Sequence, residues 1–250
     1  MKTLFLAWQA PDPVRAWFPI GRLDAAPEES YYRFRYTGGA LEAQQQTGMR
    51  PLVAFPDFHR QYESPELFPL FKNRVLSPSR RDFAEYLGWL DLDAAHSDPI
   101  AMLAVTGGER TTDNLEVFPK VEKDAGGHFK VRFFLHGMRH VSVPAKERGS
   151  QLKDGEMLRV MVEMDNPATR LALALHTDDY QMVGWAPLYL VRDLMQSVSQ
   201  SPMLAAHVVK VNEGPAPLNR RVLVELSGHA GEGFDPMTTP DFRPLIEGGG

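Results

Sequence analysis

The residue types that often carry catalysis are present in this 250-residue chain, but not in the spacings that catalytic motifs require. The chain has eight histidines and no cysteine, which excludes disulfides, thiolate zinc sites and cysteine nucleophiles. His136 and His140 are four residues apart in a strand-like run, where side chains at even spacing share a face. Acids are sparse around them, so we expect no metal site there.

Two carboxylate pairs are the other candidates for chemistry. Asp91 with Asp93 and Asp178 with Asp179 fall where a helix end or a hairpin turn is expected, which favours solvated turn residues. The sequence has no Gly-x-x-x-x-Gly-Lys-Ser/Thr, His-Glu-x-x-His or Gly-x-Ser-x-Gly motif. We therefore predict a protein that is not an enzyme, with no catalytic residues, no cofactor and no metal.

Charge limits the kinds of ligand that the chain can bind. There are 27 Lys and Arg against 32 Asp and Glu, a net charge of −5, and neither half has a basic excess. A tight, sequence-independent binder of duplex DNA neutralises many phosphates and needs such an excess. Any contact with nucleic acid is therefore expected to be small and local.

The apolar stretch at the start of the chain, Leu4 to Trp8, is shorter than the core of a secretory signal and is ended by Pro11 and Asp12. It predicts a first strand. No run approaches the roughly 18 apolar residues of a membrane span. We expect a soluble, cytoplasmic protein with no membrane contact.

The first half of the chain predicts an α+β module. Two helices are expected to start at Ser64-Pro65 and Ser77-Pro78, because a serine cap followed by proline is typical of a first turn. Apolar patterns predict strands at Thr3–Trp8, Trp17–Leu23 and Tyr31–Tyr36, and a hairpin of Ile100–Val105 with Leu115–Phe118. Five aromatic residues are expected in the core, and their joint exposure would instead mark a partner site: Phe55, Phe58, Tyr62, Phe68 and Phe71.

The second half predicts a mainly β module with one helix, from Pro187 to about Ser199. Six short apolar runs separated by turn signals predict its strands, at Phe129–His136, Met157–Met164, Leu171–Leu175, Gln181–Trp185, Ala206–Val211 and Val222–Leu226. Six short strands with one helix favour a small, partly open barrel of OB or SH3 type. The polar stretch after Lys120 marks the linker. The predicted division is 1–120, 128–226 and an irregular tail over 227–250.

Within residues 128–226, the order of several motifs resembles the HIRAN domain. The stretch Val162–Pro167 leads into the apolar strand Leu171–Leu175, then into Val183–Pro187 and a helix. Phe133–His140 stands where the family has the end of its first strand. Ala168 and Thr169 replace the family's Tyr and Asp after Asn-Pro.

The resemblance implies an OB-like barrel that binds single-stranded DNA or a free 3′ end. It assigns the phosphate and stacking roles to Arg139 and His140, and a polar contact to Asn166. It implies a close backbone approach at Gly184, while Trp185 stacks on a base or belongs to the core.

Residues 1–119 resemble the N-terminal subdomain of HipA-type serine/threonine kinases. The matching features, in order, are Ile20–Leu23, Tyr32–Tyr36, Gly39–Leu41, Leu52–Phe58, Leu67–Leu76 and the closing stretch to Pro119. In that family the subdomain is not catalytic and packs on the kinase core. The resemblance therefore implies a module for protein interaction.

Two functions follow from these expectations. The first is a non-catalytic protein that binds DNA through the HIRAN-like module, while the other module binds a helicase, nuclease or kinase-like partner. The alternative is a regulatory, antitoxin-like partner of a HipA-type kinase with no DNA binding of its own, which the acidic balance and the missing Tyr-Asp pair favour.

Overall fold

The computed structural model describes residues 1–110, 112–200, 204–231 and 233–246. The chain divides into two compact units. The first unit comprises residues 1–84, 93–120 and 237–250, and the second comprises residues 85–92 and 121–236. Two segments thus depart from the predicted division, because residues 85–92 group with the second unit and residues 237–250 with the first.

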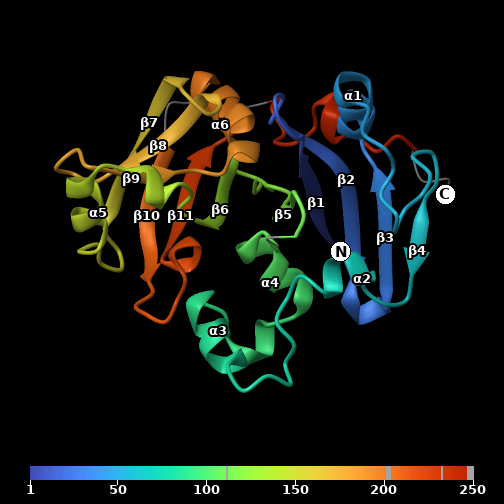
Figure 1. Ribbon diagram of the computed structural model, residues 1–250, viewed down its shortest axis with the longest axis horizontal. Coiled ribbons are helices and arrows are strands. Elements are labelled where there is room, and N and C mark those ends of the chain that lie inside the picture. Colours follow the sequence, from blue (N-terminus) through green and yellow to red (C-terminus); the bar gives the residue numbers. More distant parts are fainter. Residues whose placement is uncertain (111, 201–203, 232, 247–250) are drawn as a thin grey trace. The chain divides into compact units, whose positions relative to one another are not determined.

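The first unit is built on a five-stranded antiparallel sheet with the order β4-β3-β2-β1-β5. Its strands are β1 (Lys2–Gln9), β2 (Trp17–Ala26), β3 (Tyr31–Tyr36), β4 (Tyr62–Ser64) and β5 (Leu115–Pro119) (Figure 1). The predictions for β1, β2, β3 and β5 are confirmed. Alternate residues face opposite sides of a strand, so the apolar positions of β1, β2 and β3 gather on one face.

That face supports an aromatic core. Phe34 stacks on Phe55 with ring centroids 3.9 Å apart, and the Tyr36 hydroxyl donates to the Phe55 carbonyl at 2.7 Å. Phe55, Phe58 and Phe71 are buried, while Tyr62 and Phe68 are half-buried and pack on them. The aromatic set is therefore core and forms no exposed surface.

The helices of the first unit differ from the predictions. They are α1 (Gly38–Thr47), α2 (Pro69–Lys72) and α4 (Pro99–Thr106), with short 3-10 turns η1 (Pro27–Glu29) and η2 (Ala94–His96). The predicted strand Ile100–Val105 was wrong because Asp98 caps a helix there, its carboxylate accepting from the Ile100 and Ala101 amides at 2.8 and 2.9 Å.

The two predicted helix starts were also early. The Ser64 hydroxyl accepts from the Glu66 amide at 3.1 Å in a turn, and a helix begins only at Pro69. Ser77 makes a similar local contact with Ser79, and α3 (Phe83–Trp89) begins six residues after Ser77. Serine side chains stabilise turns by the same hydrogen bonds that cap helices, so a Ser-Pro pair in the sequence does not distinguish a turn from a helix start.

The second unit contains a six-stranded antiparallel sheet with the order β6-β11-β10-β7-β8-β9. All six predicted strands are confirmed, as β6 (His128–Phe134), β7 (Met157–Asn166), β8 (Arg170–His176), β9 (Met182–Trp185), β10 (Leu204–Val211) and β11 (Val222–His229). Among the described residues, the two edges of the sheet meet only at one isolated bridge, which joins His136, two residues beyond the end of β6, to Trp185 of β9. The pairing is thus not that of a closed barrel, and the chain is a mixed α+β fold of mainly antiparallel sheets.

The second unit has more helix than the single one predicted. The predicted helix is α6 (Leu188–Gln200), and α5 (Val143–Gly149) is an additional one. Ser142 caps α5 by accepting from the Ala145 amide at 3.3 Å, and Pro144 lies in its first turn. Two 3-10 turns, η3 (Met138–His140) and η4 (Leu218–Arg220), complete the unit.

The tail was predicted to be irregular from residue 227 and partly packed by Phe234, Phe242 and Leu245; its first residues instead extend a strand, while Phe242 and Leu245 do pack on the first unit. β11 runs on to His229 because it keeps pairing with β6 as far as His128. Further on, η5 (Pro240–Phe242) places Phe242 edge-on to Phe5, with centroids 4.9 Å apart. The Leu245 amide then donates to the Tyr36 carbonyl at 2.9 Å.

Within the described part of the chain, no helix is both long enough and apolar enough to cross a membrane.

Candidate functional site

The bridge that links the two sheet edges of the second unit also positions the predicted aromatic residue. His136 and Trp185 exchange two backbone hydrogen bonds of 3.0 Å. The next residue, Gly137, has a φ of +69°, and a Cβ atom there would lie 2.4 Å from the Trp185 ring. The indole therefore lies directly on the backbone of Gly137, and only glycine fits this position.

Gly137 turns the chain into η3, which carries Arg139 and His140. Both side chains are exposed, and Arg139 Nε donates to His140 Nε2 at 2.9 Å. His140 was predicted to share a strand face with His136, but it lies in this 3-10 turn, because β6 ends at Phe134 and Gly137 redirects the chain.

A carboxylate that the sequence analysis did not single out connects the remaining polar residues. Glu163 Oε2 accepts from the Trp185 indole Nε1 at 2.7 Å and from Asn166 Nδ2 at 3.0 Å. Glu163 lies within the stretch Val162–Pro167, so its position beside Asn166 was the available signal. Its hydrogen bond fixes the orientation of the indole ring.

Asn166 is buried, and both the oxygen and the nitrogen of its side-chain amide make hydrogen bonds within the unit. Its Oδ1 accepts from the backbone amides of Ala168 and Thr169 at 3.0 and 3.1 Å, which closes the turn between β7 and β8. Gly184 likewise permits a close backbone approach inside the sheet, since a Cβ atom there would lie 2.8 Å from the His136 carbonyl oxygen.

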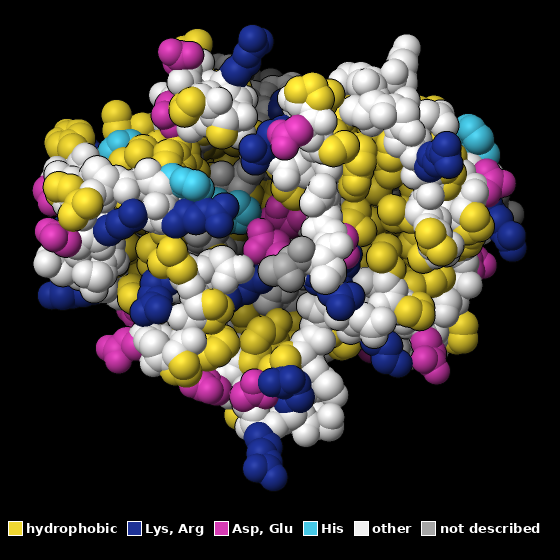
Figure 2. All heavy atoms as spheres, in the orientation of Figure 1, with side chains coloured by type: hydrophobic (Ala, Val, Ile, Leu, Met, Phe, Trp, Pro, Cys, Tyr) yellow, Lys and Arg dark blue, Asp and Glu magenta, His cyan; other side chains and the backbone are white. Residues whose placement is uncertain are grey.

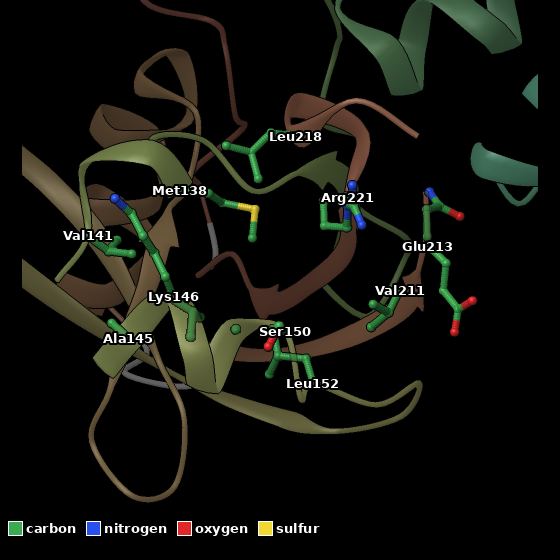
Figure 3. Close-up of a pocket in the computed structure, with 13 residues that line it drawn as sticks. Met138, Val141, Ala145, Lys146, Ser150, Leu152, Val211, Glu213, Leu218 and Arg221 are labelled. Atoms are coloured by element: carbon green, nitrogen blue, oxygen red, sulfur yellow. The ribbon is translucent and has the colours of Figure 1, made fainter. Parts of the chain in front are cut away.

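Beside η3, the second unit is hollowed by a cavity of about 450 Å³. Figure 3 shows the Met138 side chain pointing into this space, with Leu218 and Arg221 on one side and Lys146 on another. The lining comes from η3, α5, β9, β10 and the η4 region: Met138, Val141, Ala145, Lys146, Gly149, Ser150, Leu152, Val183, Val211, Asn212, Glu213, Leu218 and Arg221. Apolar side chains predominate, as in pockets that take a small organic group.

Three cations near the cavity make no ion pair with the described carboxylates; we call them the rim cations. They are Arg139, next to Met138 in the chain, and Lys146 and Arg221 in the lining. Arg221 Nη2 donates to the Ala216 carbonyl at 2.8 Å, and its Nε is buried with no partner among the described residues. Glu213 is the one acid among the lining residues.

Several other cations of the second unit are engaged in ion pairs, unlike the rim cations. Lys130 and Arg132 both contact Glu225, at 3.2 and 2.9 Å. Burial alone would raise the pKa of Glu225, but these two cations outweigh burial and lower the pKa. Arg159 contacts Asp178 at 3.1 Å. Among the described residues, the lysine and arginine ion pairs of this unit include Lys123–Asp235, Lys130–Glu225, Arg132–Glu225, Arg132–Asp91, Arg148–Glu156, Arg148–Asp179 and Arg159–Asp178. The rim cations differ from these in being available to an external anion.

The predicted turn carboxylates behave as structural residues. Asp178 and Asp179 lie in the turn between β8 and β9, and each faces an arginine, Asp179 at 3.1 Å from Arg148. Asp91 contacts Arg132 at 3.0 Å. These ion pairs give Asp91, Asp178 and Asp179 a structural role.

Comparison with known proteins adds little to this description. No family model matches the chain, and no curated protein matches it. A structural-genomics crystal structure of a protein from Lactobacillus plantarum is similar to part of the chain, with 16% sequence identity over 41% of this chain and 100% of that chain and a TM-score of 0.32.

Proposed function

We propose that the second unit is a HIRAN-like domain that binds the end of a single-stranded DNA chain. The observation that carries this proposal is the group of rim cations beside a largely apolar cavity. A cation without a carboxylate partner is available to a phosphate, and an apolar cavity suits a sugar or base.

The sheet order supports the HIRAN-like fold. The two edge strands meet through the bridge of His136 with Trp185, as expected of a partly open, OB-like barrel. The same bridge brings Trp185 beside η3, so the ring and the Arg139–His140 pair belong to one local region. In this proposal Arg139 contacts the phosphate that joins the last two nucleotides, and His140 or Trp185 stacks on a base.

Charge distribution favours a small contact over a long one. On the face that Figure 2 shows, Lys and Arg side chains are interspersed with Asp and Glu, with no broad field of one sign among the described residues drawn there. A strand end needs only a few phosphate contacts, which the rim cations can supply. In this proposal the first unit binds a helicase, nuclease or kinase-like protein, and the protein acts in the cytoplasm without catalysis of its own.

The test is fluorescence anisotropy at about 50 mM salt, because phosphate contacts weaken steeply as salt rises. The labelled substrates are a single strand with a free 3′ hydroxyl, the same strand with a 3′ phosphate, a duplex with a 3′ overhang and a blunt duplex. We expect preference for the free 3′ end and about tenfold weaker binding by Arg139→Ala, since a charge-assisted hydrogen bond contributes roughly 1.5 kcal/mol or more.

Lys130→Ala is the matched control, because it removes an exposed cation that is already paired with Glu225. It is expected to bind all four substrates as the unaltered protein does. Equal, weak binding of every substrate at low salt would contradict the proposal and favour the regulatory partner of a HipA-type kinase.

A further inference from the structure

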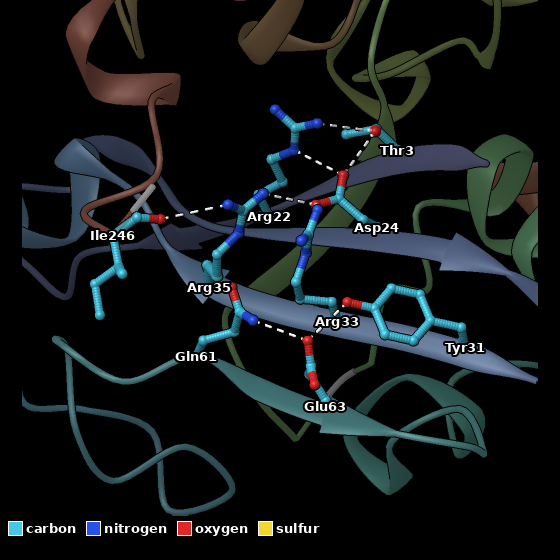
Figure 4. Close-up of polar contacts among 9 residues, drawn as sticks. All are labelled: Thr3, Arg22, Asp24, Tyr31, Arg33, Arg35, Gln61, Glu63 and Ile246. Atoms are coloured by element: carbon cyan, nitrogen blue, oxygen red, sulfur yellow. Dashed lines mark hydrogen bonds and ion pairs between the residues drawn. The ribbon is translucent and has the colours of Figure 1, made fainter. Parts of the chain in front are cut away.

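The sheet of the first unit carries a cluster of arginines on the face opposite its aromatic core. Arg22 on β2 pairs in register with Arg35 on β3, and Asp24 on β2 pairs with Arg33 on β3. Residues two apart in a strand point the same way, so all four side chains lie on one face. Figure 4 shows the three guanidinium groups turned toward the Asp24 carboxylate; we call this group the arginine cluster.

Asp24 is fully buried and its two oxygens are already occupied. Oδ1 accepts from Arg22 Nε at 2.8 Å and from the Thr3 hydroxyl at 2.9 Å. Oδ2 accepts from Arg35 Nη2 at 2.8 Å and Arg33 Nη2 at 3.2 Å. Burial by itself would raise the pKa of Asp24, but these hydrogen bonds and the charges of Arg22 and Arg35 outweigh it and lower the pKa.

One carboxylate does not balance three guanidinium groups, of which that of Arg35 is buried and those of Arg22 and Arg33 are half-buried. Glu63, the other acid drawn beside the cluster, accepts instead from the Tyr31 hydroxyl at 2.7 Å and Gln61 Nε2 at 2.8 Å. Asp24 leaves its ion-paired group with an excess of two positive charges, and the exposed Glu63, across from Arg33 in register, lowers the excess to one. Charges removed from water are normally paired, so this excess calls for an anion.

Unused donors in the cluster point to the same conclusion. The Nε atoms of Arg33 and Arg35 are buried and have no hydrogen-bond partner among the described residues. The Arg35 side chain is only 8% exposed, whereas those of Arg22 and Arg33 are 24% and 20% exposed. A ligand therefore has access to the cluster past Arg22 and Arg33.

We propose that the arginine cluster binds a phosphate group, held by Arg22, Arg33 and Arg35. A phosphate carries close to two negative charges at neutral pH, which is enough to balance the excess, and its several oxygens suit the planar fork of guanidinium donors. A carboxylate offers only two oxygens to the donors of three guanidinium groups. The ligand is either free phosphate or a phosphate monoester.

The test is a titration of the full chain, labelled with ¹⁵N, in which the arginine Nε–H resonances are followed by NMR. The probes are inorganic phosphate and phosphoserine, with sodium chloride at equal ionic strength as the reference. We expect the Arg33 and Arg35 resonances to shift with both phosphates and not with chloride. Tighter binding of phosphoserine would identify an ester as the ligand, and equal or weaker binding would identify free phosphate.

Three variants isolate the cluster. Arg22→Gln is expected to weaken phosphate binding at least tenfold. Arg33→Lys is also expected to weaken it, and because this variant keeps a cation opposite Asp24, it serves as the test if Arg22→Gln does not fold. Arg50→Gln, an exposed arginine of the same unit, is expected to bind normally. Unchanged binding by Arg33→Lys would contradict the proposal.

One acid of the chain itself is a competing occupant. Arg35 Nη1 donates to the Ile246 carbonyl at 3.3 Å, and the next residue in the sequence, Glu247, lies outside the described residues. The titration is therefore repeated with Glu247→Gln. Unmoved Arg33 and Arg35 resonances in both this variant and the unaltered chain would overturn the proposal.

Discussion

The arginine cluster of the first unit and the rim cations of the second unit use the same residue types in opposite ways. In the cluster, strand register brings three arginines to one buried carboxylate, so their positions are set by the fold. The rim cations lie on a 3-10 turn, a short helix and the start of a strand, with no carboxylate partner among the described residues. Cations held by an internal acid contribute to stability whether or not they also bind a phosphate, whereas the rim cations, in our proposal, contact a ligand and contribute little to stability.

The largest expected effect follows from removing the central acid of the cluster. Asp24→Asn leaves three largely buried guanidinium groups without a counter-charge, and breaking a buried ion pair on one side costs roughly 3–5 kcal/mol. Urea unfolding measures this loss of free energy. Asp12→Asn, whose side chain is 84% exposed and 3.8 Å from Arg15, is the control and should change stability by less than about 0.5 kcal/mol. An unchanged unfolding midpoint for Asp24→Asn would show that the cluster contributes nothing to stability.

The pH dependence of unfolding tests the contact between Asp24 and the arginines through the charge of Asp24 alone. The pKa of Asp24 is lower in the folded chain than its ordinary value near 3.9, so the unfolded chain takes up the proton first as pH falls. The stabilisation by Asp24 is fully present above that ordinary value and is lost as pH drops through the lowered folded value. Unfolding free energies measured from pH 6 to pH 2.5 should fall less steeply for Asp24→Asn. Parallel curves would disprove the assignment.

In the second unit, the contact between Gly137 and Trp185 is expected to be the most sensitive. Gly137→Ala combines a strained positive φ with a clash against the indole ring and should cost about 2–4 kcal/mol. Gly155→Ala is a matched control, because its φ is +80° and nothing lies within 4 Å of the added Cβ, so only strain of about 1 kcal/mol remains. Thermal unfolding of both variants gives the difference, and equal losses would mean that the ring does not depend on Gly137.

The smallest effect is expected at Glu163. Glu163→Gln keeps an oxygen acceptor for the Trp185 indole and Asn166 but removes its charge, which should cost about 1 kcal/mol. The chemical shift of the Trp185 Nε1 proton reports this hydrogen bond directly. A shift identical to that of the unaltered protein would show that the carboxylate does not orient the ring.

Strands were easier to predict from this sequence than helices, for a physical reason. An apolar run such as Val222–Leu226 between turn residues leaves few alternatives to a strand, and all six strands of the second half were found. Ser64-Pro65 and Asp98-Pro99 carry similar capping chemistry, yet only the second begins a helix. Local hydrogen bonds do not decide between a turn and a helix, because the packing of the following residues does.

The candidate site was only partly visible in the sequence. Arg139, His140 and Trp185 stand at positions of the HIRAN-like motifs, and Gly137 and Glu163 fall inside the stretches Phe133–His140 and Val162–Pro167 of the same motifs. Lys146 and Arg221 gave no signal, because they reach the cavity from α5 and from the residue just before β11, which are far apart along the chain. Ion pairing is equally hidden, since Lys130 and Lys146 are alike in sequence and differ only in having or lacking a carboxylate beside them.

The salt dependence of single-strand binding tests the central claim most directly. For a single-stranded oligonucleotide with a free 3′ end, each phosphate contact contributes about 0.7 to the slope of log K against log salt. Arg139→Gln should therefore reduce the slope by about 0.7, and Lys130→Gln, which is paired with Glu225, should leave it unchanged. If both variants reduced the slope equally, or if neither did, the distinction between paired cations and rim cations would be contradicted.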